Sequence, residues 1–181
     1  GFLSEQISNY VGNSWCGRRV TYSVESSPLG TGGAIRLAMH ANELDLALVV
    51  NGDTLFDCNL SHLFSNVNGG DWSTKMVLRQ IEDCTRYGRV ELDSRNRVIN
   101  FGEKGHTGPG YINAGIYLQR KAPLDSFGTS AFSFENDYLA NKLADLMIEA
   151  TVCEGYFIDM GIPEDLARAR HDLQNMKTKP R

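Results

Sequence analysis

The strongest hydrophobic pattern in the chain is a run of five apolar residues, Leu46–Val50, which stops at Asn51. The run is too short for a buried helix, and its valines and leucines favour a central strand buried on both faces of a parallel sheet. Ligands of open α/β sheets bind beyond the carboxyl ends of such strands. There Gly52 would let a ligand approach the backbone, and Asp53 offers the hard oxygen ligands that Mg²⁺ prefers. Alternatively, Asp53 only caps the next turn, where aspartate is common.

Helix and strand patterns alternate through the first part of the chain. Apolar residues at helical spacing predict a helix that ends at Gly12, and apolar–polar alternation predicts a strand over residues 19–24. Residues 25–34 are rich in glycine and predict a loop that leads into a helix over residues 34–44. Glycines in such a loop also permit close approach of a flat or charged ligand. A purely structural turn is the alternative.

The second part of the chain begins with a predicted helix over residues 60–67 and a strand over residues 75–80, so the alternation predicts βαβ crossovers. Short strands over residues 89–92 and 97–101 flank a turn-rich tetrad and predict a hairpin. The remaining predicted elements are a strand over residues 111–118, a helix over 135–146, strands over 149–153 and 156–160, and an amphipathic helix that opens at Pro163. The predicted fold class is α/β, with a mostly parallel sheet and a small antiparallel hairpin region.

Composition limits the classes of function. At 181 residues, the chain is long enough for the core of one domain and short for two. Its net charge of -4 and pI of about 5.6 provide no basic stripe, which argues against a nucleic-acid partner but not against a small phosphorylated ligand. Neither an apolar run of membrane-spanning length nor a signal-peptide pattern occurs. We expect a cytoplasmic protein that does not bind membranes.

The residues that most often bind zinc are scattered. The cysteines are Cys16, Cys58, Cys84 and Cys153, and the histidines are His40, His62, His106 and His171. None of the cysteines forms a C-x-x-C pair, so we expect small buried apolar side chains in a reducing compartment. We predict no zinc site.

Six short motifs occur in an order that resembles the sugar-phosphate nucleotidylyltransferases, also called NDP-sugar pyrophosphorylases. They are E-x-x-P-L-G-T-G-G-A-I at residues 25–35, N-G-D at 51–53, R-Y-G-R-V-E at 86–91, F-G-E-K at 101–104, Y-I-N-A-G-I-Y at 111–117 and Y-F-I-D-M-G-I-P-E-D at 156–165. The last motif, with F-S-F-E at residues 132–135, most resembles the branch of D-glycero-D-manno-heptose 1-phosphate guanylyltransferases.

The resemblance implies a Rossmann-like fold and a nucleotidylyl transfer. A nucleoside triphosphate and a sugar 1-phosphate would react to give an NDP-sugar and pyrophosphate, in the synthesis of cell-surface polysaccharide precursors. At residue 25 a carboxylate can accept from the ring N–H and the amino group of guanine, whereas uracil and thymine present flanking carbonyls that repel it. GTP is therefore the favoured substrate.

The resemblance also implies the site residues. The catalytic residues would be Asp53 and Asp159, which together bind Mg²⁺, and Lys104, a point charge on the sugar phosphate. The nucleotide would contact Glu25, Pro28, Leu29, Gly30, Thr31, Gly32 and Gly52, and the sugar would contact Gly88, Glu103, Lys104 and Asn113. The structural alternatives are a helix cap for Asp159, an exposed ion pair for Glu103 and Lys104, a turn glycine for Gly88, and an amide bonded to backbone for Asn113.

One diagnostic motif of the family, G-G-x-G-T-R followed by a P-K pair, does not occur in the 181 residues. Those groups would cradle the triphosphate and stabilise charge, so without them we expect most activity to be lost. The alternative function is therefore a non-catalytic module that binds or assembles around a sugar nucleotide or sugar phosphate. A metal-dependent glycosyltransferase is a weaker alternative, because the chain has no D-x-D triplet near Asp53.

The same comparison predicts self-association. In the family's sheet, two further strands lie between residues 19–24 and Leu46–Val50, so this chain is expected to be truncated and to have an open apolar strand edge. The chain would then be insoluble alone, or a homo-oligomer or strand-exchanged dimer would cover the edge, or the sheet would be rearranged so that residues 19–24 pair directly with Leu46–Val50. We favour the rearranged or self-associated form.

Overall fold

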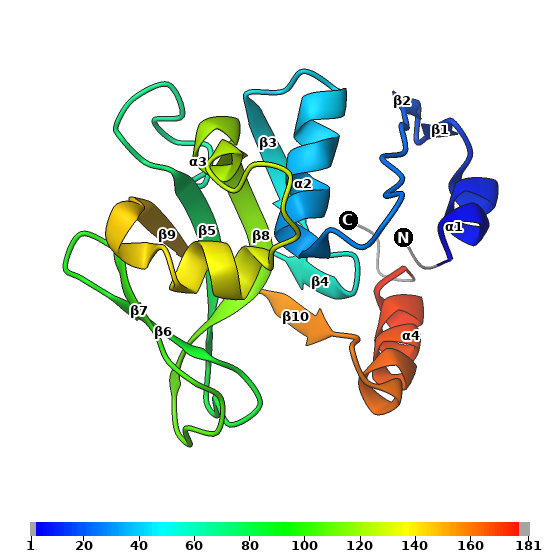
Figure 1. Cartoon of the computed structure of the whole chain (residues 1–181). Coiled ribbons are helices and arrows are strands. Elements are labelled where there is room, and N and C mark those ends of the chain that lie inside the picture. The colour runs from blue at the N-terminus through cyan, green and yellow to red at the C-terminus, as the bar shows by residue number, and fades with distance from the viewer. Residues whose placement is uncertain (1–2, 178–181) are drawn as a thin grey trace. The chain divides into compact units, whose positions relative to one another are not determined.

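The computed structural model describes residues 3–177 and divides into two compact units (Figure 1). One unit comprises Gly1–Ala47 with Arg120–Leu146, and the other comprises Leu48–Gln119 with Met147–Arg181. Each unit is described by itself below. That the chain acts as the single domain expected from its length stays a prediction. Within residues 3–177, no helix has the length and apolar character needed to cross a bilayer.

The main sheet is mixed and lies mostly in the second unit, with strand order β7-β6-β8-β5-β9 and β3 paired to β8 (Figure 1). The strands are β3 (Leu46–Val50), β5 (Thr74–Ile81), β6 (Arg89–Leu92), β7 (Val98–Phe101), β8 (Gly110–Arg120) and β9 (Ile148–Cys153). The two long strands β5 and β8 carry the core, since nearly all of their central side chains are buried. The predicted hairpin is confirmed as β6 and β7, whose turn is closed by a bond from the Asn96 amide to the Asp93 carbonyl at 3.1 Å.

Strand direction requires a correction. The ladder between β5 and β9 is parallel, but those joining β5 to β8, β8 to β6 and β6 to β7 are antiparallel. The expectation of a mostly parallel sheet therefore does not describe these pairings. The physical reason is that short connections suffice between antiparallel neighbours, and the short loops around β6 and β7 bring β8 back beside β5.

A second, two-stranded ladder joins β4 (Thr54–Asp57) to β10 (Tyr156–Asp159) in antiparallel register. Phe56 and Phe157 face each other across it in an edge-to-face contact, with ring centroids 5.6 Å apart. The helix α4 (Pro163–Lys177) follows, as Pro163 predicted. Residues 60–67, predicted as a helix, instead form successive turns around the fully buried Leu63.

Strand β3 has the predicted bounds but not the predicted burial. Leu48 and Val50 are 44% and 53% exposed, so the strand is not buried on both faces. Within residues 3–177 its strand partner is β8. The burial expected from an apolar run depends on neighbours on both sides, and a run of Val and Leu does not reveal how many neighbours a strand has.

The first unit is mainly helical. It contains α1 (Ser4–Val11), the short antiparallel strands β1 (Ser14–Trp15) and β2 (Arg18–Arg19), α2 (Gly30–Ala41), α3 (Lys121–Asp125), a π-helix η1 (Phe134–Ala140) and a 3₁₀ turn η2 (Leu143–Asp145). As predicted, the first helix ends at Gly12, which has a positive φ of 70°. The packing of α2 against α3 and η1 forms the centre of this unit.

The strand predicted over residues 19–24 is wrong beyond Arg19. Only β2 pairs in this region, with β1, and residues 20–25 have no strand geometry. A rearranged sheet in which residues 19–24 pair with β3 is therefore also wrong. Alternation predicts a strand only if a neighbouring backbone is available for hydrogen bonds, and here the Tyr22 hydroxyl bonds the Gly12 carbonyl while Val24 is 61% exposed.

Candidate functional site

The two aspartates expected to bind a metal lie next to each other at one end of the β4–β10 ladder. Asp159 ends β10 opposite Thr54, the residue after Asp53. The Met160 amide donates to the Asp53 carbonyl at 2.7 Å, which ties the two chain segments together. Backbone pairing thus brings together two residues that are far apart in the sequence.

Among residues 3–177, neither carboxylate forms an ion pair with a Lys, Arg or His side chain. The Asp53 Oδ1 accepts from the Thr54 hydroxyl at 3.5 Å, and the Asp159 Oδ1 accepts from the Gly161 amide at 2.9 Å, ahead of α4. No group of three or more His, Cys, Asp or Glu side chains with metal-binding geometry occurs in the described chain. Mg²⁺ is commonly held by one or two carboxylates, with waters and substrate phosphates completing the shell. Two adjacent hard carboxylates fit that ion.

Three of the predicted sugar-side residues, Gly88, Glu103 and Lys104, lie on two loops that are joined by backbone contacts. The Gly105 amide donates to the Thr85 carbonyl at 3.1 Å, and the Gly102 amide donates to the Arg89 carbonyl at 2.7 Å. A Cβ on Gly88 would lie 2.8 Å from the Gly102 carbonyl oxygen, so glycine is required there by this close approach. Glu103 and Lys104 follow Gly102 and are exposed, and neither forms a salt bridge with the other.

Asn113 lies on β8, within the same unit. Its amide nitrogen donates to the Tyr117 hydroxyl at 2.5 Å, and its Oδ1 accepts from the Gly115 amide at 3.0 Å. These bonds agree with the structural alternative, in which Asn113 is an amide bonded within the protein. A sugar contact would have to share them.

Sequence patterns did not identify an ion-pair cluster beside Asp159. The Arg86 Nη2 lies 2.7 Å from the Asp165 Oδ2, and the Arg168 Nη2 lies 2.9 Å from the other oxygen of the same carboxylate. Asp165 is 3% exposed and lies in the first turn of α4. The R-Y-G and P-E-D motifs contain these residues, but 79 positions separate Arg86 from Asp165, so no local pattern could pair them.

The predicted nucleotide-binding segment lies in the first unit, where its glycines belong to the first turn of α2 and not to a free loop. The Phe132 amide donates to the Leu29 carbonyl at 2.9 Å, and the Gly32 amide donates to the Phe132 carbonyl at 3.0 Å. The Thr31 hydroxyl accepts from the Phe134 amide at 2.8 Å. The motifs P-L-G-T-G-G and F-S-F-E are therefore bound to each other.

Close packing explains two of these glycines. A Cβ on Gly30 would lie 2.4 Å from the Phe132 carbonyl oxygen, and one on Gly32 would lie 2.1 Å from the Phe132 ring. Glu25 precedes this turn and accepts a long bond from the Leu29 amide at 3.4 Å, while Pro28 is exposed. Gly52, in the other unit, has no atom within 4 Å of an added Cβ, so the space beside it is open.

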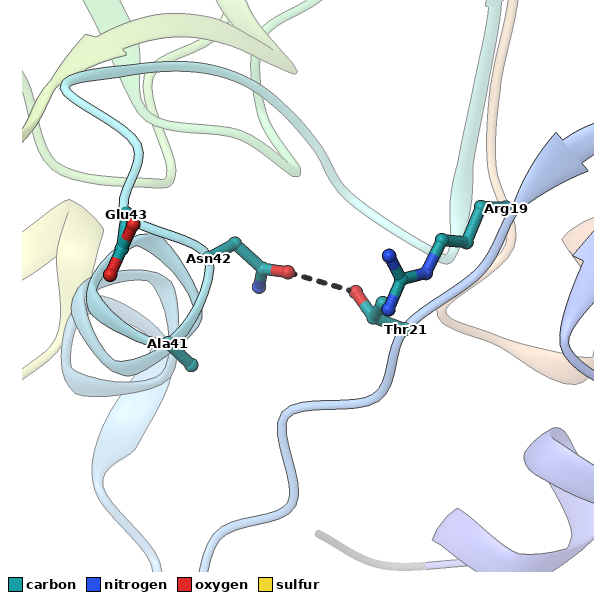
Figure 2. A pocket seen from close by; sticks show the side chains of 5 residues that line it. All are labelled: Arg19, Thr21, Ala41, Asn42 and Glu43. Carbon is teal, nitrogen blue, oxygen red and sulfur yellow. Dashed lines mark hydrogen bonds between the residues drawn. The ribbon is translucent and has the colours of Figure 1, made fainter.

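A hollow of about 450 Å³ in the first unit contains none of the predicted site residues. Figure 2 shows Asn42 pointing toward Thr21, with Arg19, Ala41 and Glu43 around it. A hydrogen bond of 3.2 Å joins the Thr21 hydroxyl to the Asn42 carbonyl oxygen (Figure 2). All five side chains are exposed, so the hollow is a surface depression and not an enclosed site.

Comparison with known proteins identifies relatives over nearly the whole chain. A D-glycero-alpha-D-manno-heptose 1-phosphate guanylyltransferase from Aneurinibacillus thermoaerophilus is 36% identical over 176 residues, which are 97% of this chain and 76% of that protein. The protein of the same name from Campylobacter jejuni is 41% identical over 164 residues, which are 89% of this chain and 71% of that protein.

Solved structures agree. The crystal structure of HddC from Yersinia pseudotuberculosis matches this structure with a TM-score of 0.79 and 33% sequence identity. The match includes 95% of this chain and 75% of the HddC chain. The same protein complexed with GMP-PN matches with 32% identity and a TM-score of 0.77. The α/β, Rossmann-like fold class expected from the motifs is thereby confirmed.

The match to a protein family extends over nearly the whole chain. The family model for nucleotidyl transferases matches residues 2–175, a span that includes all six motifs and both aspartates. The resemblance found in the motifs is therefore confirmed, and the chain belongs to the nucleotidyl transferase family.

Proposed function

We propose that this protein transfers a guanylyl group from GTP to a heptose-type sugar 1-phosphate, producing an NDP-sugar and pyrophosphate for cell-surface polysaccharide synthesis. The observation that supports it most directly is the placement of Asp53 beside Asp159 on paired strands, in a chain that resembles two heptose 1-phosphate guanylyltransferases.

Asp53 and Asp159 would together hold Mg²⁺, as their hard oxygen donors suit that ion. A bound Mg²⁺ would screen the repulsion between the two phosphate groups that must approach each other. Lys104, exposed and unpaired with Glu103, would place a mobile positive charge on the sugar phosphate. Glu103 would accept bonds from sugar hydroxyls, and the Gly88 backbone would contact the ring.

Glu25 would select the base. A carboxylate can accept hydrogen bonds from both the ring N–H and the amino group of guanine. Uracil and thymine present carbonyl oxygens beside their ring N–H, and these oxygens repel a carboxylate. The bond that Glu25 accepts from Leu29 is long, at 3.4 Å, so it competes weakly with a base.

The first experiment incubates the purified chain with GTP, D-glycero-α-D-manno-heptose 1-phosphate and Mg²⁺, and measures pyrophosphate release. Turnover supports the proposal. Calorimetric binding of the sugar phosphate without turnover supports instead the alternative function, a binding module. If the protein shows no turnover and binds no sugar phosphate, both the proposed and the alternative function are excluded.

A second experiment measures base selectivity by titrating GTP, UTP and dTTP into the protein. We expect GTP to bind about tenfold or more tightly than either pyrimidine, and Glu25→Gln to reduce that ratio, because the amide presents a donor in place of one acceptor. Tighter binding of UTP or dTTP by the unmodified protein would show that the base assignment is wrong.

A further inference from the structure

The ion-pair cluster Arg86–Asp165–Arg168 holds a guanidinium in a defined position near the proposed metal ligands. Asp165 is buried, and each of its two oxygens lies within 3 Å of a different arginine, at 2.7 Å and 2.9 Å. A buried carboxylate is stable as an ion when paired in this way. If Arg86 moved away from the first turn of α4, Asp165 would keep Arg168 on one oxygen and lose its partner on the other, so the bond to Asp165 favours this position of Arg86.

The rest of the Arg86 guanidinium is available to a ligand. Its side chain is 51% exposed, and the bond to Asp165 uses Nη2, whereas a guanidinium has five N–H donors. The carbon of the group lies 5.8 Å from the centre of the Tyr87 ring, which also limits its position. A half-exposed arginine that is fixed on one side is well suited to bind a phosphate on the other.

The surroundings of Arg86 are those of the proposed phosphate site. The pKa of Arg86 is raised, first by the hydrogen bond to Asp165 and also by the negative charge of Asp159, so the Asp159 carboxylate lies within electrostatic range. The bond between Gly105 and Thr85 joins the loop of Lys104 to the loop of Arg86. Arg86 and Lys104 thus lie on two loops that a backbone hydrogen bond joins, and Asp159 acts electrostatically on Arg86.

We propose that Arg86 binds the phosphate group of the sugar 1-phosphate, and that Asp165 is the positioning residue that holds it there. The inference rests on the proposed function and adds to it a phosphate ligand that the sequence motifs did not indicate. The planar guanidinium would donate to phosphate oxygens through the N–H groups that Asp165 does not use.

The experiment compares three variants of the full 181-residue chain. Arg86→Gln removes the charge, and Arg86→Lys keeps the charge but loses the fork of donors. Arg168→Gln is the matched control, because it removes the other arginine partner of Asp165, and the Arg168 side chain is 59% exposed against 51% for Arg86. Calorimetry measures the affinity for heptose 1-phosphate. We expect Arg86→Gln to weaken binding about tenfold or more, Arg86→Lys to weaken it less, and Arg168→Gln to change it less than about twofold.

A second measurement separates phosphate binding from a purely structural role. Removing a positive charge near Asp159 lowers the repulsion of a metal ion, so Arg86→Gln should bind Mn²⁺, followed by water proton relaxation, at least as tightly as the unmodified protein. A collapsed loop would instead weaken Mn²⁺ and sugar phosphate together. Asp165→Asn should weaken sugar phosphate binding as Arg86→Gln does. If the Asp165→Asn variant does not fold, the Arg86 variants alone test the inference.

Each result bears on the inference. If the unmodified protein binds heptose 1-phosphate and Arg86→Gln binds it equally well, Arg86 is not a phosphate ligand and the proposed function is unaffected. A parallel loss of Mn²⁺ and sugar phosphate in Arg86→Gln overturns the inference in favour of a structural clamp. If the unmodified protein binds no sugar phosphate, the inference and the proposed function both fail.

Discussion

At the scale of single residues, the chemistry of this protein depends on which side chains the backbone brings together. Asp53 and Asp159 become neighbours through the antiparallel pairing of β4 with β10. Cys58 and Cys153 also lie close together, near the other ends of β4 and β9, and the Cys153 Sγ donates to the Asn59 carbonyl at 3.6 Å. The first pair has exposed oxygen atoms suited to a metal, and the second is largely withdrawn from solvent.

Replacing either aspartate with asparagine should remove metal binding and leave the fold in place. We expect Asp53→Asn and Asp159→Asn each to weaken Mn²⁺ affinity about tenfold or more, since an amide oxygen carries no negative charge. Circular dichroism should be unchanged because neither side chain is part of the buried core. As a control, Asp57→Asn changes an exposed aspartate at the far end of β4. Full metal affinity in Asp53→Asn or Asp159→Asn would contradict the assignment.

The cysteines should differ in reactivity. Burial, together with the neighbouring Cys153, raises the pKa of the Cys58 thiol to about 11, and burial also raises the pKa of Cys84. Because the thiolate is the nucleophile, Cys58 stays protonated at pH 8 and its thiolate fraction grows as the pH rises toward 11. We expect iodoacetamide to modify the exposed Cys16 first at pH 8, and Cys58 faster at pH 10 than at pH 8.

Peptide mass spectrometry over time would measure these rates. Cys16→Ser provides the control that identifies the fast site. Modification of Cys58 at pH 8 as fast as that of Cys16 would show that its thiol is not shielded. The expectation that all four cysteines are buried is already wrong for Cys16, which follows β1 and is exposed.

At the scale of elements, the glycine-rich segment shows how packing can determine a residue's role. Its composition predicted a loop ahead of a helix, but α2 begins at Gly30 and the segment is packed against residues 132–134. Phe132 is 4% exposed and stacks on Phe127 with ring centroids 4.1 Å apart. The buried Gly32 lets the helix approach the Phe132 ring, and the buried Gly33 faces Leu29.

Gly32→Ala should therefore destabilise the protein although alanine favours helices. The gain in helix propensity is about 1 kcal/mol, whereas overpacking a filled site costs about 1–3 kcal/mol. The added Cβ would lie 2.1 Å from a ring that is stacked and has little room to move, so the clash should dominate. Urea denaturation would measure the change in free energy of unfolding.

Gly52→Ala is the matched control for this substitution, because no atom lies within 4 Å of the added Cβ. We expect its free energy of unfolding to change by less than about 0.5 kcal/mol. A Gly32→Ala variant as stable as the unmodified protein would mean that the helix and Phe132 are not in close contact in solution.

At the scale of the whole molecule, the open side of β3 supports the prediction of self-association. Leu48 and Val50 are large apolar side chains that are 44% and 53% exposed on this strand. Exposed strand edges with apolar side chains pair readily with other strands, so a second copy of the chain is the expected partner. The homo-oligomer and the strand-exchanged dimer stay predictions, as does the cytoplasmic location.

Val50→Lys should reduce this association, because a charged side chain on an edge strand disfavours pairing. Light scattering over a range of protein concentrations would measure the mass. Ile99→Lys is the control, since Ile99 is 56% exposed on β7, the strand at one end of the order β7-β6-β8-β5-β9. A wild-type monomer at all concentrations, or a Val50→Lys variant that associates as strongly as the wild type, would contradict the prediction.

Elements with local signals could be predicted from the order of residues alone. The hairpin β6–β7 follows from its turn residues, α4 from Pro163, and the bounds of β3 from its apolar run, because turn chemistry and periodicity involve residues close in the chain. The family also followed from the sequence, since six motifs in order identify it without coordinates.

Features that join distant residues could not be predicted without the three-dimensional fold. The antiparallel neighbours of β8, the exposure of β3, the missing strand over residues 20–25 and the bond between Arg86 and Asp165 all depend on segments far apart in the sequence. A strand pattern indicates that a segment can pair, and a charged residue requires a partner or water when it is buried. Neither signal identifies which residue the partner is. Pairing is set by which backbones and side chains the whole fold brings within hydrogen-bond distance.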